Sequence, residues 1–168
     1  MRDSLRRSFS DPAFGALFRG LVVLIPALLA GCGPAAPPPP TVVAVKLVAS
    51  DDVNGSAPVA VRVYQLASKA GFEGAEFFKL YKADAATLGA DLIKKDEVLL
   101  APGATKVLML SPTDPVKAIG IFVAYANYQT ATWSGDADVP PHETTTVNAA
   151  VGASAVKVTT APGKPAGS

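Results

Sequence analysis

Short apolar runs rich in β-branched residues recur from residue 42 to residue 159, separated by Gly, Pro, Asp and Asn. Such runs with turn residues between them are typical of the strands of a β-sandwich. In the run 59–66, Val59, Val61 and Val63 alternate with a mixed set of residues, which indicates one buried face. The pattern predicts seven or eight strands, at residues 42–49, 59–66, 97–100, 106–110, 118–127, roughly 130–134, 143–149 and 155–159.

The run 118–127 differs from the others because both of its faces are apolar. Ile119 and Ile121 fall on one face of the predicted strand, and Phe122 and Ala124 fall on the other. A strand without a polar face lies centrally in a sheet or beneath a covering element. We therefore expect this strand to be the least exposed one in the fold.

Residues 72–92 replace the strand pattern with the three- and four-residue spacing of helices. The apolar positions with this spacing are Phe77, Leu80, Tyr81 and Leu88. Asp84 is a candidate N-cap, so we expect two short helices whose apolar side covers one sheet. The fold class is thus all-β, a two-sheet sandwich over residues 42–160 with a short helical insertion. Residues 161–168, which hold two Pro and two Gly, are predicted to be a disordered tail.

Residues 1–31 have the order of a secretory signal peptide, with a basic segment, a short apolar run at 21–29 and a small-residue cleavage site. A transmembrane helix would need about 20 apolar residues, whereas the strictly apolar stretch here is shorter and contains Pro26. A buried structural cysteine is also disfavoured, because Gly and Pro flank the chain's one cysteine, Cys32. We interpret Cys32 as the first residue of the mature chain.

Leu29, Ala30, Gly31 and Cys32 resemble the lipobox of bacterial lipoproteins, in which the cysteine receives a diacylglycerol thioether. Each buried methylene contributes about 0.8 kcal/mol, so two or three acyl chains make a durable anchor. In such lipoproteins an Asp after the cysteine signals inner-membrane retention. Gly33 stands there instead, so the resemblance implies the outer membrane with the domain facing the periplasm. Residues 32–41 contain four consecutive prolines and should form an extended spacer.

Composition limits the remaining functions. Without residues 1–31 the chain has 137 residues, the length of one domain. This part holds 11 Lys and Arg against 12 Asp and Glu, so its formal charge of −1 offers no basic surface to nucleic acid. Once Cys32 carries lipid, no disulfide can form within the mature chain.

Residues that could carry chemistry are scarce. A serine or cysteine nucleophile needs a positioned base, usually histidine, and we expect the one histidine, His142, to be a solvated loop residue beside two prolines. The same scarcity argues against a metal site, and Glu73 and Glu76 are typical of the solvated face of a helix. The sequence therefore predicts no enzyme, no cofactor apart from the covalent lipid, and no small-molecule substrate.

The most polar loop consists of Ser50, Asp51, Asp52, Val53, Asn54, Gly55, Ser56 and Ala57. It fails as a calcium loop, because Ser50 and Val61 stand where the first and last acidic ligands belong. Two hypotheses stay open. The loop is a hairpin turn in which Asn54-Gly55 supplies positive φ, or it is a recognition loop, since it is longer than a tight hairpin requires. Trp133 is interpreted as a core or rim residue rather than a ligand platform.

Four further motifs follow the lipobox in a fixed order, namely Val-Arg-Val-Tyr-Gln-Leu at 61–66, Phe-Phe-Lys-Leu-Tyr at 77–81, Leu-Gly-Ala-Asp-Leu at 88–92 and Pro-Gly at 102–103. In this order they resemble the TssJ (SciN) family of type VI secretion lipoproteins, over about residues 42–158. The resemblance implies a transthyretin-like sandwich with a small helical insertion. It also implies a role as the outer-membrane part of a trans-envelope complex that binds the periplasmic part of the inner-membrane protein TssM. In the family the loop between the first two strands makes that contact, which corresponds by position to residues 50–57.

Other functions compete with this one. A lipid-anchored carrier of a small ligand would need a concave apolar pocket, which the sequence does not reveal. Another kind of envelope-assembly lipoprotein is a second alternative, and a periplasmic enzyme is weaker than either.

We expect Cys32→Ser to release or mislocalise the protein and to impair secretion, because a hydroxyl group cannot accept the thioether. Membrane fractionation of cells grown with labelled palmitate measures this. Label on the variant, or an unchanged outer-membrane fraction, would refute the assignment of Cys32 as the lipidated residue.

Overall fold

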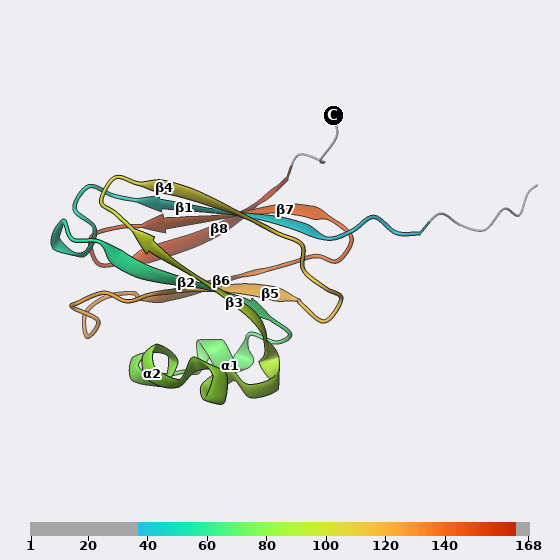
Figure 1. Ribbon diagram of the computed structural model, residues 1–168, viewed down its shortest axis with the longest axis horizontal. Helices are drawn as coiled ribbons and strands as arrows, with labels where there is room; N and C mark the ends of the chain where they lie inside the picture. The colour runs from blue at the N-terminus through green and yellow to red at the C-terminus, as the bar shows by residue number, and fades with distance from the viewer. Residues whose placement is uncertain (1–36, 164–168) are drawn as a thin grey trace, which may run out of the picture. The chain divides into compact units, whose positions relative to one another are not determined.

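The computed structural model describes residues 37–163, which fold into eight strands and a short helical insertion. The strands are β1 (Val42–Ala49), β2 (Val59–Leu66), β3 (Leu92–Leu100), β4 (Thr105–Leu110), β5 (Ala118–Val123), β6 (Ser134–Asp138), β7 (Thr144–Val151) and β8 (Val156–Pro162). They form sheet A, in the order β4-β1-β7-β8, and sheet B, in the order β3-β2-β5-β6 (Figure 1). The predicted two-sheet β-sandwich is confirmed.

Alternation along the strands decides which side chains enter the core between the sheets. In β1, Val43, Val45 and Leu47 are fully buried, whereas Lys46 and Val48 on the outer face are exposed. β1 pairs antiparallel with β4 and parallel with β7, so sheet A is a mixed sheet. The inner faces of the two sheets together bury one apolar cluster, which holds the domain together through the hydrophobic effect.

The helical insertion covers the outer face of sheet B (Figure 1). It consists of α1 (Ala70–Glu73), α2 (Phe77–Leu88) and the 3₁₀ turn η2 (Gly89–Asp91). A second buried cluster fills the space between helices and sheet, and its members are Tyr64, Leu66, Phe72, Phe77, Leu80, Leu88, Ala118 and Phe122. β5 is buried along its whole length because it lies between the two clusters. The sequence-based expectation for this strand is confirmed.

Phe77 is the centre of an aromatic group in the second cluster. Its ring centroid lies 4.5 Å from that of Tyr128, 5.2 Å from Phe122 and 5.5 Å from Trp133. Tyr81 stacks on Phe77 at 5.7 Å, but it is 45% exposed, so it lies at the rim instead of under the helix as predicted. The guanidinium carbon of Arg62 lies over the Tyr81 ring, 5.6 Å from the ring centroid.

A break in α2 is held by charged side chains from sheet B. Ala83 has non-helical dihedral angles, and Nη1 of Arg62 donates to the carbonyl oxygens of Leu80 and Tyr81, both at 3.0 Å. Helix carbonyls without an amide donor need such a partner. After the break, Asp84 accepts a hydrogen bond from the amide of the next residue at 2.8 Å. The predicted N-cap position thus marks the start of a second helical turn.

Asp84 is also the acceptor that ties this turn to the sheet. Lys95 Nζ lies 2.9 Å from Asp84 Oδ2, and the Tyr64 hydroxyl donates to the same oxygen at 3.1 Å. Burial alone would raise the pKa of Asp84, but the hydrogen bonds from Lys95, the Ala85 amide and Tyr64 outweigh it and lower that pKa. Burial raises the pKa of Tyr64, which therefore stays a donor.

Several strand boundaries differ from the prediction. β3 begins at Leu92, five residues earlier than predicted, because it is an edge strand whose polar residues face solvent. β5 ends at Val123, and the chain then forms a loop over residues 124–133. The strand predicted at 130–134 is therefore wrong except for Ser134, since Trp133 leaves the strand pattern to pack on the buried clusters.

The first three residues of the predicted C-terminal tail are part of the fold. Ala161 and Pro162 belong to β8, where Pro162 pairs with Thr145, and the amide of Gly163 donates to the Thr144 carbonyl at 2.8 Å. Proline is tolerated here because β8 is an edge strand. The remainder of the predicted tail, the predicted signal peptide and Cys32 lie outside the described residues. Within the described residues, no helix has the length and apolar character needed to cross a membrane.

We expect Phe77→Ala to lower the free energy of unfolding by about 3 to 5 kcal/mol, because it empties the centre of the aromatic group. The neighbouring Phe78, 46% exposed, supplies the control. Urea denaturation of Phe78→Ala should show a much smaller loss. If the two variants lose the same stability, the helical insertion does not stabilise the sandwich in the way described.

Candidate functional site

Four connections lie together at one end of the sandwich, which we call the loop end. They are the β1–β2 loop (residues 50–58), the β3–β4 turn (101–104), the β5–β6 loop (124–133) and the β7–β8 turn (152–155). The strand register places them together, because Val48 pairs with Thr105 and Ala49 with Val151. Figure 1 shows them at the left of the molecule.

The chain enters the domain at the opposite end, which we call the entry end (Figure 1). Residues 38–41 lead into β1 there, beside the β6–β7 loop. The amide of His142 donates to Thr41 Oγ1 at 2.9 Å, and His142 Nδ1 lies 3.0 Å from the carbonyl oxygen of Pro39. His142 is exposed, as predicted, and its contacts join residues 39–41 to the β6–β7 loop. The eight residues of β1 separate the two ends by about 26 Å.

The β1–β2 loop is not a hairpin turn. β1 belongs to sheet A and β2 belongs to sheet B, so the loop must cross from one sheet to the other. Face-to-face sheets are about 10 Å apart, which a two-residue turn between paired strands does not span. The structure therefore rejects the hairpin hypothesis, and the length of the loop follows from the crossing.

The middle of this loop is a short 3₁₀ turn, Val53–Gly55. Val53 is fully buried in the core cluster. Asn54, Gly55 and Ser56 follow with φ angles of 51°, 70° and 61°. Left-handed backbone is readily adopted by glycine and asparagine, so the Asn-Gly pair that suggested a hairpin instead allows a tight reversal of the chain above the core.

Asn54 joins three parts of the loop end. Its side-chain Oδ1 accepts a hydrogen bond from the backbone amide of Ala126 at 2.8 Å, and its backbone amide donates to the Ala153 carbonyl at 3.1 Å. Nδ2 donates to the Pro58 carbonyl at 3.4 Å, within the loop. The side chain thereby fixes the loop to the β5–β6 loop, while the backbone fixes it to the β7–β8 turn.

Ser50 anchors the beginning of the loop through its backbone. Its amide donates to the Val151 carbonyl at 2.9 Å, and its carbonyl accepts from the Gly103 amide at 3.1 Å. With Val53 and Asn54 also anchored, the exposed residues of the loop are Asp51, Asp52, Gly55, Ser56, Ala57 and Pro58. The predicted recognition loop thus divides into an anchored frame and an exposed tip.

Sequence reasoning missed the neighbours of this tip. A pocket of about 350 Å³ lies between the β1–β2 loop and the two adjacent connections, and its lining is Asn54, Gly55, Tyr125, Ala126, Asn127, Ala153 and Ser154. The Tyr125 hydroxyl donates to the Gly152 carbonyl at 3.0 Å, and burial raises the pKa of Tyr125 to about 12. No local sequence pattern marks these residues, because three separate segments meet there.

The other candidate residues from the sequence, Trp133, Glu73 and Glu76, do not lie together in one site. Trp133 is partly buried against both apolar clusters, as predicted for a core or rim residue. Glu73 and Glu76 are exposed on the helical insertion, and Oε1 of Glu73 lies 3.7 Å from Nζ of Lys69. In the described part of the chain, no group of three or more His, Cys, Asp or Glu is placed to hold a metal ion.

The chain matches the model of a protein family over residues 41–154. That family is the type VI secretion lipoproteins, which include VasD, EvfM and TssJ. The chain belongs to this family. The family resemblance drawn from the motifs is therefore confirmed, and the family is one of secretion lipoproteins and not of enzymes.

Solved structures agree with the family match. The crystal structure of the type VI secretion lipoprotein TssJ1 from Pseudomonas aeruginosa matches at a TM-score of 0.71 and 31% identity, covering 75% of this chain and 100% of that one. Lip from Serratia marcescens, a membrane-bound component of the type VI secretion system, matches at 0.67 and 27% identity, covering 71% and 96%. A chain of a type VI membrane complex shares the fold at 0.59 and 23% identity, covering 73% and 98%. None of the curated proteins matches this type VI secretion lipoprotein.

We expect Asn54→Ala to lower the free energy of unfolding by about 2 kcal/mol. Alanine loses the hydrogen bond to the Ala126 amide and adopts positive φ at a steric cost. Asn54→Gly loses the same bond but tolerates the backbone, so its loss should be about half as large. Urea denaturation measures both, and wild-type stability in the alanine variant would refute the anchoring role of Asn54.

Proposed function

We propose that this lipoprotein is a structural component of the type VI secretion membrane complex that docks the periplasmic part of TssM to the outer membrane. Cys32 carries the lipid, and the exposed tip of the β1–β2 loop, within residues 50–57, contacts TssM. The domain works without a cofactor other than its lipid and performs no chemistry of its own. It faces the periplasm.

The anchoring part of the proposal is supported by family and sequence together. The family consists of secretion lipoproteins, and the four residues from Leu29 to Cys32 have the composition of a lipobox. The relative from Serratia marcescens is described as membrane bound. A proline-rich spacer after Cys32 would hold the domain away from the lipid headgroups, since polyproline extends by about 3.1 Å per residue.

The docking part is carried by one observation: a preorganised polar loop stands at the end opposite the point where the chain enters. Val53 and Asn54 hold the loop in one conformation. A preordered loop loses little conformational entropy when a partner binds, which favours affinity. With the entry end toward the outer membrane, the loop end extends into the periplasm, where a protein of the inner membrane can meet it.

The proposal is tested by reversing charge at the tip without disturbing the frame. Asp52 is exposed and outside the anchoring contacts of Val53 and Asn54, so Asp52→Lys should leave the melting temperature unchanged. Its affinity for the purified periplasmic region of TssM, measured by calorimetry, should fall at least tenfold. Asp114→Lys makes the same charge change in the exposed β4–β5 connection at the entry end, and it should bind as the wild type does.

The possible results distinguish whether TssM binds the domain from whether it binds at the tip of the β1–β2 loop. Equal affinity of both variants and the wild type would exclude the tip of the β1–β2 loop as the contact. An equal loss of affinity in both variants would indicate a general electrostatic effect of the added positive charge. Absence of binding by the wild-type chain would refute docking to TssM itself.

A further inference from the structure

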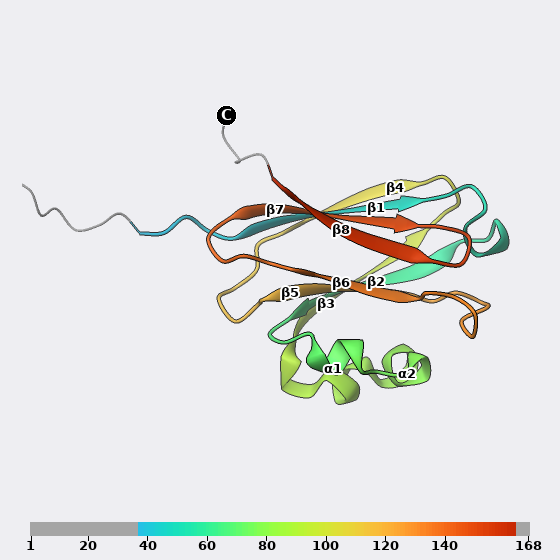
Figure 2. The same ribbon diagram turned by 180° about the vertical axis from the view of Figure 1, so that it is seen from behind.

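A second candidate site lies where the free edges of the two sheets face each other. β8 is the edge strand of sheet A and β6 is the edge strand of sheet B. Figure 2 shows both strands on the side of the sandwich that faces the viewer. They run in the same direction from a parallel bridge between Thr132 and Ala155. At this bridge the sandwich is closed.

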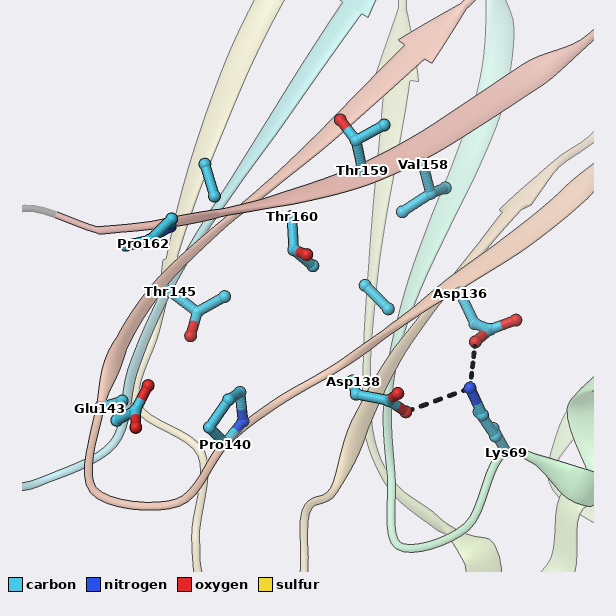
Figure 3. Close-up of a pocket in the computed structure, with 12 residues that line it drawn as sticks. Lys69, Asp136, Asp138, Pro140, Glu143, Thr145, Val158, Thr159, Thr160 and Pro162 are labelled. Carbon is cyan, nitrogen blue, oxygen red and sulfur yellow. Dashed lines mark hydrogen bonds and ion pairs between the residues drawn. The ribbon is translucent and has the colours of Figure 1, made fainter.

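Beyond the bridge the two strands separate toward the entry end. A Cβ atom on Gly135 would lie 2.8 Å from Val158 Cγ2, so β6 and β8 still touch at that level. Farther along there is an opening of about 480 Å³ between them. Figure 3 shows Thr145, Thr160 and Pro140 around this opening, with Lys69 on the side of β6.

The backbone of β8 presents hydrogen-bonding groups to this opening. The Val156 amide donates across the edge to the Thr132 carbonyl at 2.8 Å, so this amide faces β6 and not β7. Because the groups of a strand alternate in direction, the amides and carbonyls of Val158 and Thr160 face the same way. Among the described residues, no backbone hydrogen bond crosses the edge from these two residues.

β6 presents a matching row from the other side. The Val123 amide donates to the Trp133 carbonyl and the Val139 amide donates to the Lys117 carbonyl, both at 2.8 Å, so odd-numbered residues face β5. The backbone groups of Ser134, Asp136 and Asp138 therefore face β8. Two rows of edge groups thus point at each other across an opening lined by side chains.

The side chains around the opening carry an excess of negative charge. Lys69 Nζ lies 3.1 Å from a carboxylate oxygen of Asp136 and 3.1 Å from one of Asp138 (Figure 3). These two hydrogen bonds raise the pKa of Lys69, so the ammonium stays charged. Glu143 adds a third carboxylate to the lining, against the single cation of Lys69.

We propose that the opening between β6 and β8 binds an extended segment of a partner polypeptide that carries a basic side chain. The segment adds as a strand to the free edge of β8, and its main chain pairs with the backbone groups that face the opening. Its lysine or arginine lies near Asp138 and Glu143. This contact is separate from the β1–β2 loop and does not depend on docking to TssM.

Sheet edges attract strands in general, and three features favour this occupant. The opening can take side chains, the facing rows supply partners on both sides, and the net charge selects a cationic segment. A second copy of the chain pairing through β8 is a different occupant, and so is a small free cation. The experiment below distinguishes them.

The test uses the segment from residue 38 to residue 168, whose described part is one compact unit. The crystallised Pseudomonas relative matches this chain over the whole of its own length. The probe is a seven-residue peptide of alternating Thr and Val with Lys at its centre. Isotope-labelled protein is titrated with it, and amide chemical shifts are followed by NMR. We expect saturable shifts that concentrate on the part of β6 and β8 that lines the opening, at Asp136, Asp138, Val158 and Thr160.

Two variants test strand pairing and charge. Thr160→Pro removes one edge amide that faces the opening, and an edge strand tolerates proline at such a position. It should weaken peptide binding at least tenfold, whereas Thr160→Val keeps the amide and should bind as the wild type does. Glu143→Gln should weaken binding of the Lys peptide about threefold and leave a Gln-centred peptide unaffected. If Thr160→Pro is unstable, a peptide N-methylated along one edge replaces it and should fail to bind wild-type protein.

Other results would overturn the proposal. Absence of shifts on β6 and β8 at millimolar peptide would do so, as would binding that survives both the proline and the N-methylation. Dimers of the wild-type segment in sedimentation, absent from the Thr160→Pro variant, would assign the edge of β8 to a second copy. Equal shifts with free lysine would assign the opening to a small cation.

Discussion

The crossing of the chain from sheet A to sheet B after β1 is the constraint on which the candidate site depends. β1 and β2 each bury alternate side chains in the same core, but they do so from opposite sheets. The connection between them must therefore span the sandwich, and it cannot shrink to a tight turn. Val53 enters the core from this connection, so the loop is tied to the hydrophobic core that it crosses. Its exposed tip is a consequence of the fold and is available for binding.

Sheet B needs a second cover because β5 has no polar face. The helical insertion supplies this cover through Phe77 and its aromatic neighbours. Two of those neighbours, Tyr128 and Trp133, belong to the β5–β6 loop, and Ala126 of the same loop donates to Asn54. A contiguous set of contacts thus runs from the insertion to the β1–β2 loop. The insertion therefore supports the loop end as well as the sheet.

The two ends and the open edge give the domain three separable surfaces. The entry end receives the chain at residues 38–41, the loop end presents a polar tip, and the edge between β6 and β8 presents strand groups without a backbone partner across the edge. A β-sandwich suits this division, because its strands are a rigid frame and its connections and edges vary freely. All three surfaces lie on one domain of the type VI secretion lipoprotein family.

The sequence by itself determined the elements whose pattern is local. Short β-branched runs predicted the bounds of β1 and β2, the doubly apolar β5 predicted a central or covered strand, and Asp84 predicted where a helical turn restarts. The lipobox-like residues 29–32 and the order of the motifs after them indicated the family. Edge strands were predicted less well, because β3 and the end of β8 bury only part of their side chains and lack a clear pattern. Only the tertiary structure decided that the β1–β2 loop crosses between sheets, since an Asn-Gly pair permits positive φ in a hairpin and in a crossing loop alike. The pocket beside Asn54 and the opening beside Thr160 also required the fold, because each joins segments that are distant in sequence.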